Sequence, residues 1–258
     1  MNVLRGALIF LAQLIITPIV LVLMMLAIPL GGRVVFNLAR AWCGSMVLLG
    51  RLLGIRHELV YEGEKPAGAA VVLSKHSSAW ETFFIVSHFA HLAPVVKREL
   101  LWVPFFGWGL ALCRPIAINR SARREARAQL QDQGVDRLQR DMSIMIFPEG
   151  TRIPPGKRGR YATGGVALAM AANAPVLAMA HDAGFFWRKA LFDKRAGVIR
   201  VRFSAPLYAA PGETAIEFNR RIEDWIESTI ESFGHAPAER TPAAQAALAA
   251  ASGSSATA

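Results

Sequence analysis

The sequence contains only two cysteines, Cys43 and Cys113, and neither belongs to a C-x-x-C pair or a zinc-type His/Cys spacing. A disulfide framework and a structural zinc site are therefore not expected. Acidic residues are also scarce, since 19 Asp and Glu stand against 29 Lys and Arg, a net charge of +10. A basic chain that is 53% hydrophobic is typical of a protein on an anionic bilayer. Nucleic acid attracts the same charge, so charge alone does not decide between these partners.

Charge is missing altogether from Gly6 to Gly32, between Arg5 and Arg33. As a helix this run would be ~40 Å long, enough to cross a hydrocarbon core of about 30 Å. A cleavable signal peptide usually has an apolar region of only ~7–15 residues, so we interpret the run as a retained membrane helix. Pro18 lies in its middle and basic residues flank both ends, so its orientation and whether it spans the bilayer stay open.

The next segment, residues 34–55, has two different faces when drawn as a helix. One face carries Arg33, Asn37, Arg40, Gly44 and Arg51, and the others carry Val35, Leu38, Trp42, Met46, Leu49 and Leu53. This pattern is typical of a basic amphipathic helix in a membrane interface, and the alternative is a helix packed on the soluble part of the protein. We predict that residues 1–55 form a two-helix membrane anchor.

Residues 56–233 are predicted to form one α/β domain. Apolar runs suited to buried strands lie at 69–74, 93–97, 115–119, 143–147, 175–180 and 198–203, and helical patterns lie at 121–141, 163–173 and 213–233. Strands that alternate with helices favour a mostly parallel mixed sheet with helices on both faces. Residues 234–258 are rich in Ala, Ser, Thr and Pro and are expected to be disordered, with a frayed helix over 242–251 as the alternative.

Polar residues follow four of the predicted strands, where ligands bind in open α/β sheets. These residues are His76, Arg120, Glu149 and His181. Strands that deliver polar side chains to one edge of a sheet indicate a site there. We interpret His181 as a structural or site-lining residue rather than as a second base.

His76 and Glu81 combine a base with a carboxylate. On one continuous helix five residues rotate the side chains by ~140°, so the two meet only if His76 lies in a loop and Glu81 in the first helical turn. The stretch from Ser78 to Glu81 fits a capping box with Ser78 as the N-cap. We interpret Glu81 as fixing the tautomer of His76, and the alternative is that Glu81 only caps the helix. No G-x-S-x-G elbow surrounds Ser77 or Ser78, so a serine nucleophile has little support.

A second motif, Phe147-Pro148-Glu149-Gly150-Thr151-Arg152, follows another apolar run. Proline stops strand pairing, and glycine lets the backbone approach a ligand closely. Glu149 can accept a hydrogen bond from a substrate hydroxyl, and Arg152 can hold a phosphate through its guanidinium fork. The alternative is an ordinary turn with a surface ion pair.

The two motifs, KHSSAWE at 75–81 and FPEGTR at 147–152, resemble those of the 1-acylglycerol-3-phosphate acyltransferases, members of the H-x-x-x-x-D superfamily of phospholipid synthesis. The resemblance runs from Val71 to Gly184. Between the motifs, the segments 97–100, 104–109 and 116–120 look like the family's intermediate blocks, and 174–184 looks like its fourth block.

The resemblance implies that His76 deprotonates the free sn-2 hydroxyl of lysophosphatidic acid, which attacks an acyl thioester, while Glu81 orients His76. The substrate-binding residues that it implies are Lys97, Arg120, Glu149, Gly150, Thr151 and Arg152. Gly150 and neighbouring amides, with Lys97, would favour the oxyanion. Arg120 and Arg152 would hold the glycerol phosphate, and Glu149 would order the glycerol backbone of this acceptor.

The implied donor is acyl-CoA or acyl carrier protein, with no metal or other cofactor. The expected partners are membrane lipids, namely lysophosphatidic and phosphatidic acid, and acyl carrier protein if it is the donor, but not nucleic acid. The expected location is the inner membrane, with the catalytic domain on its cytoplasmic face.

Three departures from the family pattern leave room for other acceptors. Position 81 is Glu where the family usually has Asp, the stretch 161–164 lacks a lysine, and Ala178-Met179 replaces a Pro-Val pair. The alternatives are the same chemistry on glycerol 3-phosphate or a lyso-aminolipid, a lipid hydrolase, and a non-enzymatic membrane-tethered binding protein.

Overall fold

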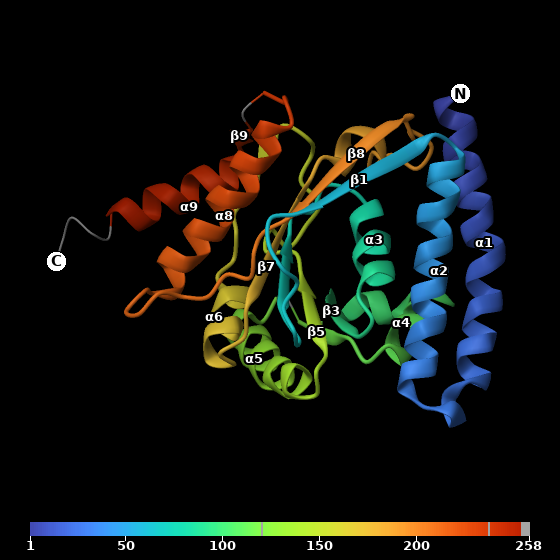
Figure 1. Cartoon of the computed structure of the whole chain (residues 1–258), viewed down its shortest axis with the longest axis horizontal. Helices are drawn as coiled ribbons and strands as arrows, with labels where there is room; N and C mark the ends of the chain where they lie inside the picture. The colour runs from blue at the N-terminus through green and yellow to red at the C-terminus, as the bar shows by residue number, and fades with distance from the viewer. Residues whose placement is uncertain (120, 237, 254–258) are drawn as a thin grey trace.

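The structure, a computed structural model, describes residues 1–119, 121–236 and 238–253 and is organised around a seven-stranded sheet (Figure 1). The strands are β1 (Ile55–Tyr61), β2 (Val71–Ser74), β3 (Leu92–Lys97), β4 (Ile116–Ile118), β5 (Ser143–Ile146), β7 (Val176–His181) and β8 (Gly197–Phe203). Their order is β1-β8-β7-β2-β5-β3-β4, and β7–β8 is the antiparallel pair while the other neighbours are parallel. The predicted mostly parallel mixed sheet is confirmed.

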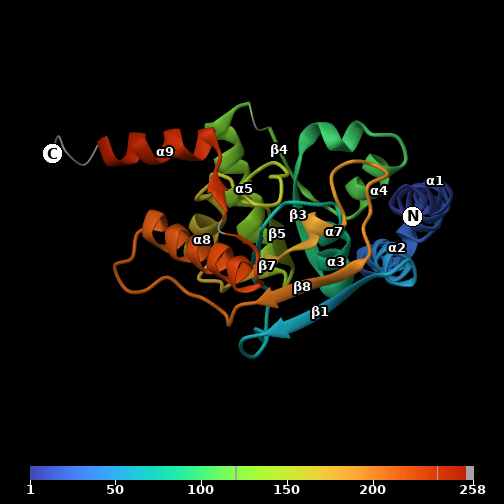
Figure 2. The same cartoon turned by 90° about the horizontal axis from the view of Figure 1, so that it is seen from above.

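Helices cover both faces of the sheet, as predicted (Figures 1 and 2). One face carries α3 (Trp80–His88), with α2 (Gly32–Leu52), α1 (Asn2–Leu26) and α4 (Phe106–Leu112) beyond it, and the other carries α5 (Arg123–Gln139), α6 (Gly164–Ala171) and α8 (Ala215–Ser232). Alternation along β2 divides the core, because Val72 packs towards α3 and Leu73 towards α6. The shorter elements are the 3-10 helices η1 (Ile28–Leu30) and η2 (Arg98–Trp102), the helix α7 (Ala183–Phe186) and the small pair β6 (Lys157–Arg158) and β9 (Glu239–Arg240).

The strand β1 was not predicted. Its burial alternates along its length, because it lies at the edge of the sheet and exposes every second residue. Such a strand lacks the continuous apolar run that marks a central strand. It forms the first segment of the α/β part and pairs in parallel register with β8, from Ile55 with Gly197 to Tyr61 with Phe203.

The helix α2 packs its apolar face on the α/β part, and the two-helix membrane anchor over residues 1–55 stays a prediction. Val35, Cys43 and Met46 from that segment are buried in the same core as Trp80 and Phe84 of α3. This is the alternative arrangement for an amphipathic helix, in which the apolar stripe meets protein rather than lipid. Residues on both sides of the predicted boundary at 55–56 therefore share one core.

The helix α1 packs along α2 and leaves its opposite face exposed. Among the described residues it is the one helix long and apolar enough to cross a bilayer. Its N-terminal end is held by the guanidinium of Arg5, which donates to the carbonyl of Leu53 at 2.7 Å, and by the edge-on packing of Phe10 against Phe192. The outward face carries Leu4, Leu8, Leu11, Ile15, Ile19, Val22 and Leu26.

The C-terminal segment is more ordered than predicted. Residues 239–240 pair with 157–158, and α9 covers Pro242–Gly253, where the predicted tail 234–258 was expected to be disordered. Alanine favours helices strongly, and the carbonyl of Thr241 accepts the amide of Gln245 at the start of the helix. Residues 237 and 254–258 of that prediction lie outside the described residues.

Candidate active site

His76 and Glu81 are in contact, in the arrangement that the sequence predicted. His76 lies in the loop after β2, and Glu81 lies in the first turn of α3. The Nδ1 atom of His76 is 2.9 Å from Oε1 of Glu81, and Glu81 is fully buried while a small part of the His76 side chain is exposed. The loop between them bends the chain enough to bring the two side chains together.

Ser78 does not form the predicted capping box. Its hydroxyl donates to the carbonyl of Trp187 at 2.7 Å and accepts the amide of Trp80 at 3.0 Å, and the N-cap position is Ala79. One of the two hydrogen bonds of a capping box is present, because Glu81 Oε1 accepts the amide of Ser78 at 2.8 Å. Ser78 is therefore tied to the loop at 187 instead of to the helix that it was expected to cap.

Three donors converge on one oxygen of Glu81. Oε1 accepts the amides of Ser77, at 3.0 Å, and of Ser78, as well as the imidazole of His76. Burial alone would raise the pKa of the Glu81 carboxyl, but the hydrogen bonds from His76 and Ser78 contribute to holding its pKa well below the usual range. An ionised Glu81 can only accept a hydrogen bond, so Nδ1 of His76 carries the hydrogen and Nε2 is left as the proton-accepting atom.

The second motif forms a tight turn after β5. The amide of Gly150 donates to the carbonyl of Phe147 at 3.0 Å, and Gly150 adopts φ +68°, a conformation that glycine tolerates best. The predicted use of this amide for an oxyanion is not supported, because the turn already engages it. The ring of Phe147 stacks on the imidazole of His76 with 3.9 Å between centroids, so the turn supports the face of the base.

Glu149 joins the two motifs through the backbone of His76. Its Oε2 accepts the amide of His76 at 2.9 Å, and its Oε1 accepts the amide of Gly159 at 3.2 Å. The carbonyl of His76 in turn accepts the amide of Ile153 at 2.8 Å. Both backbone groups of His76 are therefore held by the loop that follows β5, and Glu149 orders protein backbone here, while its predicted contact with the acceptor stays a prediction.

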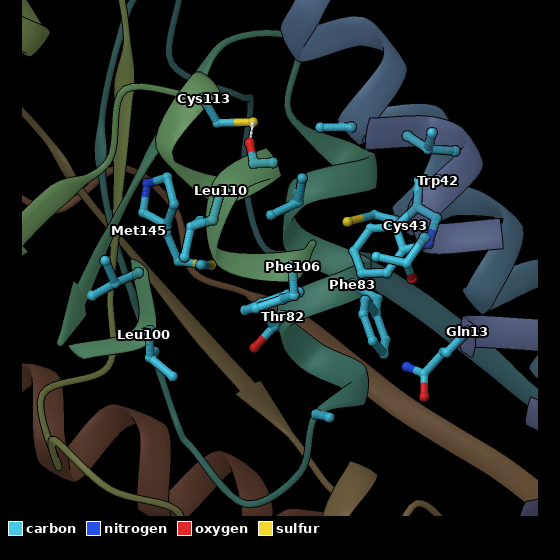
Figure 3. A pocket seen from close by; sticks show the side chains of 18 of the residues that line it. Gln13, Trp42, Cys43, Thr82, Phe83, Leu100, Phe106, Leu110, Cys113 and Met145 are labelled. Carbon is cyan, nitrogen blue, oxygen red and sulfur yellow. Dashed lines mark hydrogen bonds between the residues drawn. The ribbon is translucent and has the colours of Figure 1, made fainter. Parts of the chain in front are cut away.

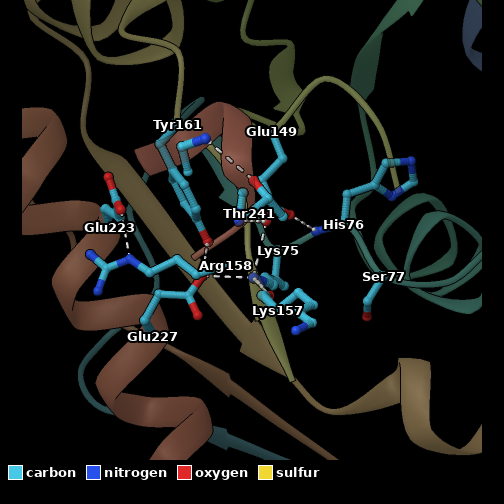
Figure 4. A network of polar contacts seen from close by, with 12 residues as sticks. Lys75, His76, Ser77, Glu149, Lys157, Arg158, Tyr161, Glu223, Glu227 and Thr241 are labelled. Atoms are coloured by element: carbon cyan, nitrogen blue, oxygen red, sulfur yellow. Dashed lines mark hydrogen bonds and ion pairs between the residues drawn. The ribbon is translucent and has the colours of Figure 1, made fainter. Parts of the chain in front are cut away.

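A buried ion network lies behind His76 and continues to α8 (Figure 4). The ammonium of Lys75 lies 3.0 Å from Glu149 Oε1 and 2.7 Å from Glu227 Oε1, and Glu227 also accepts the hydroxyl of Tyr161 at 2.9 Å. All four side chains are nearly inaccessible to solvent. Lys75 and Glu227 were not predicted as site residues from the sequence; the local signal for Glu227 is a carboxylate next to Ile226 on the apolar face of a helix.

His181 has a structural role, as predicted. Its Nδ1 accepts the amide of Ala183 at 3.2 Å, so the ring is neutral and its Nε2 donates to the carbonyl of Lys75 at 2.8 Å. Both ring nitrogens are engaged by the backbone. His181 therefore fixes the chain next to His76 and has no nitrogen left to act as a base.

The remaining predicted residues are placed differently from one another. Arg152 is half-buried and lines the cavity that contains His76, whereas Thr151 is exposed. Lys97 is exposed, and its ammonium lies 3.4 Å from Glu99. Among the described residues, Val95 and Val96 of the same strand line the cavity, and Lys97 does not. Arg120 lies outside the described residues.

An apolar cavity of about 380 Å³ is lined in part by His76 and Arg152. Four helices contribute to its walls, through Gln13 of α1, Cys43 of α2, Phe83 of α3 and Leu110 of α4, and the strands β3 and β5 also line it (Figure 3). Most of the lining is hydrocarbon, with few polar groups apart from those near His76. A cavity of this size and character suits an alkyl chain or another apolar group.

Comparisons with known proteins agree with this geometry. A family model described as Acyltransferase matches residues 57–182. A 1-acyl-sn-glycerol-3-phosphate acyltransferase of Pseudomonas aeruginosa is 47% identical over 192 residues, which cover 73% of this chain and 75% of that protein. A protein of the same name from Limnanthes alba is 27% identical over 170 residues, covering 64% of this chain and 54% of the relative.

The fold is also found in a solved structure. The crystal structure of the 1-acyl-sn-glycerophosphate (LPA) acyltransferase PlsC from Thermotoga maritima has a TM-score of 0.70 to this chain at 16% identity, covering 90% of this chain and 96% of that one. At this identity the likeness concerns the fold alone.

Proposed function

The chain belongs to the 1-acyl-sn-glycerol-3-phosphate acyltransferase family, and on that premise we propose how its residues carry out the transfer. It is a membrane-associated acyltransferase that acylates lysophosphatidic acid to phosphatidic acid. The observation that supports the proposed roles best is that His76, its Nδ1 held by Glu81, lines the same apolar cavity as Arg152.

His76 acts as the general base. Its Nε2 takes the proton of the sn-2 hydroxyl while the hydroxyl oxygen attacks the carbonyl carbon of the acyl thioester. The C–S bond then breaks, and the imidazolium returns the proton to the departing thiolate. Glu81, ionised and buried, stabilises the imidazolium that forms between these two proton transfers.

The acceptor and the acyl chain occupy different parts of the site. Arg152, the cationic side chain that lines the cavity, binds the phosphate of the acceptor by paired hydrogen bonds. The acyl chain enters the apolar cavity between α1 and α3, where it is removed from water.

The donor is acyl-CoA or acyl carrier protein, and the transfer draws on no metal ion or further cofactor, because a base and a thioester suffice for it. The lipid partners are lysophosphatidic and phosphatidic acid, and nucleic acid is not a partner. The protein lies at the inner membrane with its catalytic part on the cytoplasmic side. The exposed apolar face of α1 supports this location.

A transfer assay with purified protein in phospholipid vesicles tests the proposal. Acyl-CoA and acyl carrier protein are compared as donors, and lysophosphatidic acid is compared with glycerol 3-phosphate and with a lyso-aminolipid. We expect product with a phosphate-bearing lyso acceptor, and Arg152→Ala should mainly raise the KM for that acceptor. An unchanged KM removes Arg152 from the phosphate site, and free fatty acid as the sole product indicates a hydrolase instead.

A further inference from the structure

Six large apolar side chains are exposed on the segment from Leu100 to Trp108, which we call the aromatic segment. They are Leu100, Trp102, Val103, Phe105, Phe106 and Trp108. Trp102 is 78% exposed and Trp108 is 52% exposed. Single exposed apolar residues are common, but a contiguous patch of this kind marks a binding surface.

The aromatic segment is a folded unit and not a loose loop. Gly107 is buried and its amide donates to the carbonyl of Val103 at 2.7 Å; a Cβ at position 107 would lie 2.4 Å from the carbonyl oxygen of Leu100. Phe105 adopts φ +60°, which is rare for a residue with a side chain, and its ring packs on that of Trp108 at 5.4 Å. The fold therefore holds these rings in water at a conformational cost.

The aromatic segment continues the exposed face of α1. The helix α4, which includes Phe106 and Trp108, contacts α1, and the view from above shows the two side by side (Figure 2). A Cβ at Gly109 would lie 3.7 Å from Leu21 and 3.8 Å from Met24. The α1 residues exposed on the same helical turns are Val22, Leu23, Met25 and Leu26. The two elements thus present one apolar surface.

The charges around this surface suit an anionic lipid layer. No Asp or Glu occurs between residues 100 and 124. Lys97 and Arg98 precede the aromatic segment, Arg114 follows it, and all three are exposed; the neighbouring Glu99 pairs with Lys97. Tryptophan concentrates at membrane–water interfaces, and basic residues beside it attract anionic head groups.

The aromatic segment also borders the cavity, since Leu100, Phe105 and Phe106 line it (Figure 3). We propose that this segment inserts into the lipid monolayer that holds α1 and opens the mouth of the cavity into the apolar layer. Acyl chains then pass from the monolayer to the neighbourhood of His76 without crossing water. The inference rests on the proposed membrane location of α1.

Depth-dependent quenching tests the insertion. Three variants of the full chain each carry an environment-sensitive fluorophore on one introduced cysteine. The positions are Trp102→Cys in the aromatic segment, Leu11→Cys on the exposed face of α1 and Ser228→Cys on the exposed side of α8. Cys43 and Cys113 are buried, so the label goes to the introduced thiol. The protein is bound to phosphatidylethanolamine–phosphatidylglycerol vesicles whose acyl chains are brominated.

We expect quenching at 102 and at 11 and none at 228. If the label at position 11 is quenched but the label at position 102 is not, the inference is overturned and the proposed location of α1 stays intact. Absence of quenching at 11 contradicts the location, and the inference falls with it. A dimer that protects position 102 without lipid, and leaves it unquenched with lipid, also overturns the inference.

Paired variants supply a functional readout. Trp102→Gln/Trp108→Gln should lower kcat/KM for a long-chain acceptor in vesicles by about tenfold, and Trp102→Phe/Trp108→Phe should restore most of it. Turnover of a short-chain acceptor dissolved in water should not change. An equal loss on both acceptors, or no loss on either, contradicts insertion.

Discussion

The two sides of His76 are built from opposite kinds of side chain. On the side towards α8, Lys75, Glu149 and Glu227 form a buried ion network with hydrogen bonds at 2.7–3.0 Å. On the side towards α1, the cavity is lined by apolar groups that leave about 380 Å³ empty. One side is filled and fixed by charge, and the other is left open.

This difference separates two requirements of the reaction. A general base must be held within a fraction of an ångström, and directional hydrogen bonds to both backbone groups of His76 do so. An acyl chain needs room and an apolar wall, because its binding is non-directional. Changes on the α8 side should therefore alter stability and turnover, and changes on the α1 side should alter substrate choice.

The largest effect should come from Lys75→Met. The change leaves Glu149 and Glu227 buried without their cation, which should cost about 3–5 kcal/mol of unfolding free energy and lower Tm by about 10 °C or more. Thermal unfolding measures it. The triple variant Lys75→Met/Glu149→Gln/Glu227→Gln should recover part of the lost Tm, because it also removes the two buried negative charges. If Tm of Lys75→Met stays within about two degrees of wild type, the network does not hold the loop.

A smaller effect is expected from Glu227→Gln. The side chain keeps its shape but loses its charge, so the network weakens and kcat should fall by about ten- to a hundredfold. KM for both substrates should stay close to wild type, because Glu227 contacts neither. Steady-state kinetics measure the split, and Glu231→Gln, an exposed position on the same helix, is the matched control. A raised KM with normal kcat would place Glu227 in substrate binding instead.

The smallest effect on turnover should come from Val86→Phe on the cavity side. Val86 lines the cavity on α3, ~7.5 Å along the helix from Glu81, so a larger side chain there shortens the space for the acyl chain. We expect the preference to shift towards shorter donors by about tenfold in relative kcat/KM, since each buried methylene contributes about 0.8 kcal/mol. Val60→Phe, on the exposed side of β1, is the control. An unchanged chain-length profile would mean that the acyl chain lies elsewhere.

The features that depend on local spacing, namely the His76–Glu81 contact and the central strands, could be predicted from the sequence. His76 and Glu81 are five residues apart, and a helix start between them was enough to predict their contact. The central strands were recognisable because strands buried on both faces are continuous apolar runs. The edge strand β1 lacked this signal, and the helix at 242–253 was predicted only as the alternative, because its composition also suits disordered chains.

Contacts between distant residues could not be predicted in the same way. Lys75 and Glu227 are 152 residues apart, and neither shows a spacing that points to the other. The apolar face of α2 predicted burial correctly but not the partner, since lipid and protein select the same pattern. Likewise, the glycine of the second motif indicated a close backbone approach, and the structure shows that its amide closes a turn.

His76 acts as the base and Glu81 orients it, and the most direct test compares kcat of the Glu81→Asp and Glu81→Gln variants. The aspartate keeps the negative charge and should retain substantial activity, even with a side chain one methylene shorter. The glutamine no longer selects the Nδ1–H tautomer and should lose about 10³–10⁴-fold in kcat with little change in fold. A glutamine variant near wild-type kcat, or one more active than the aspartate variant, would mean that Glu81 only orders the start of α3.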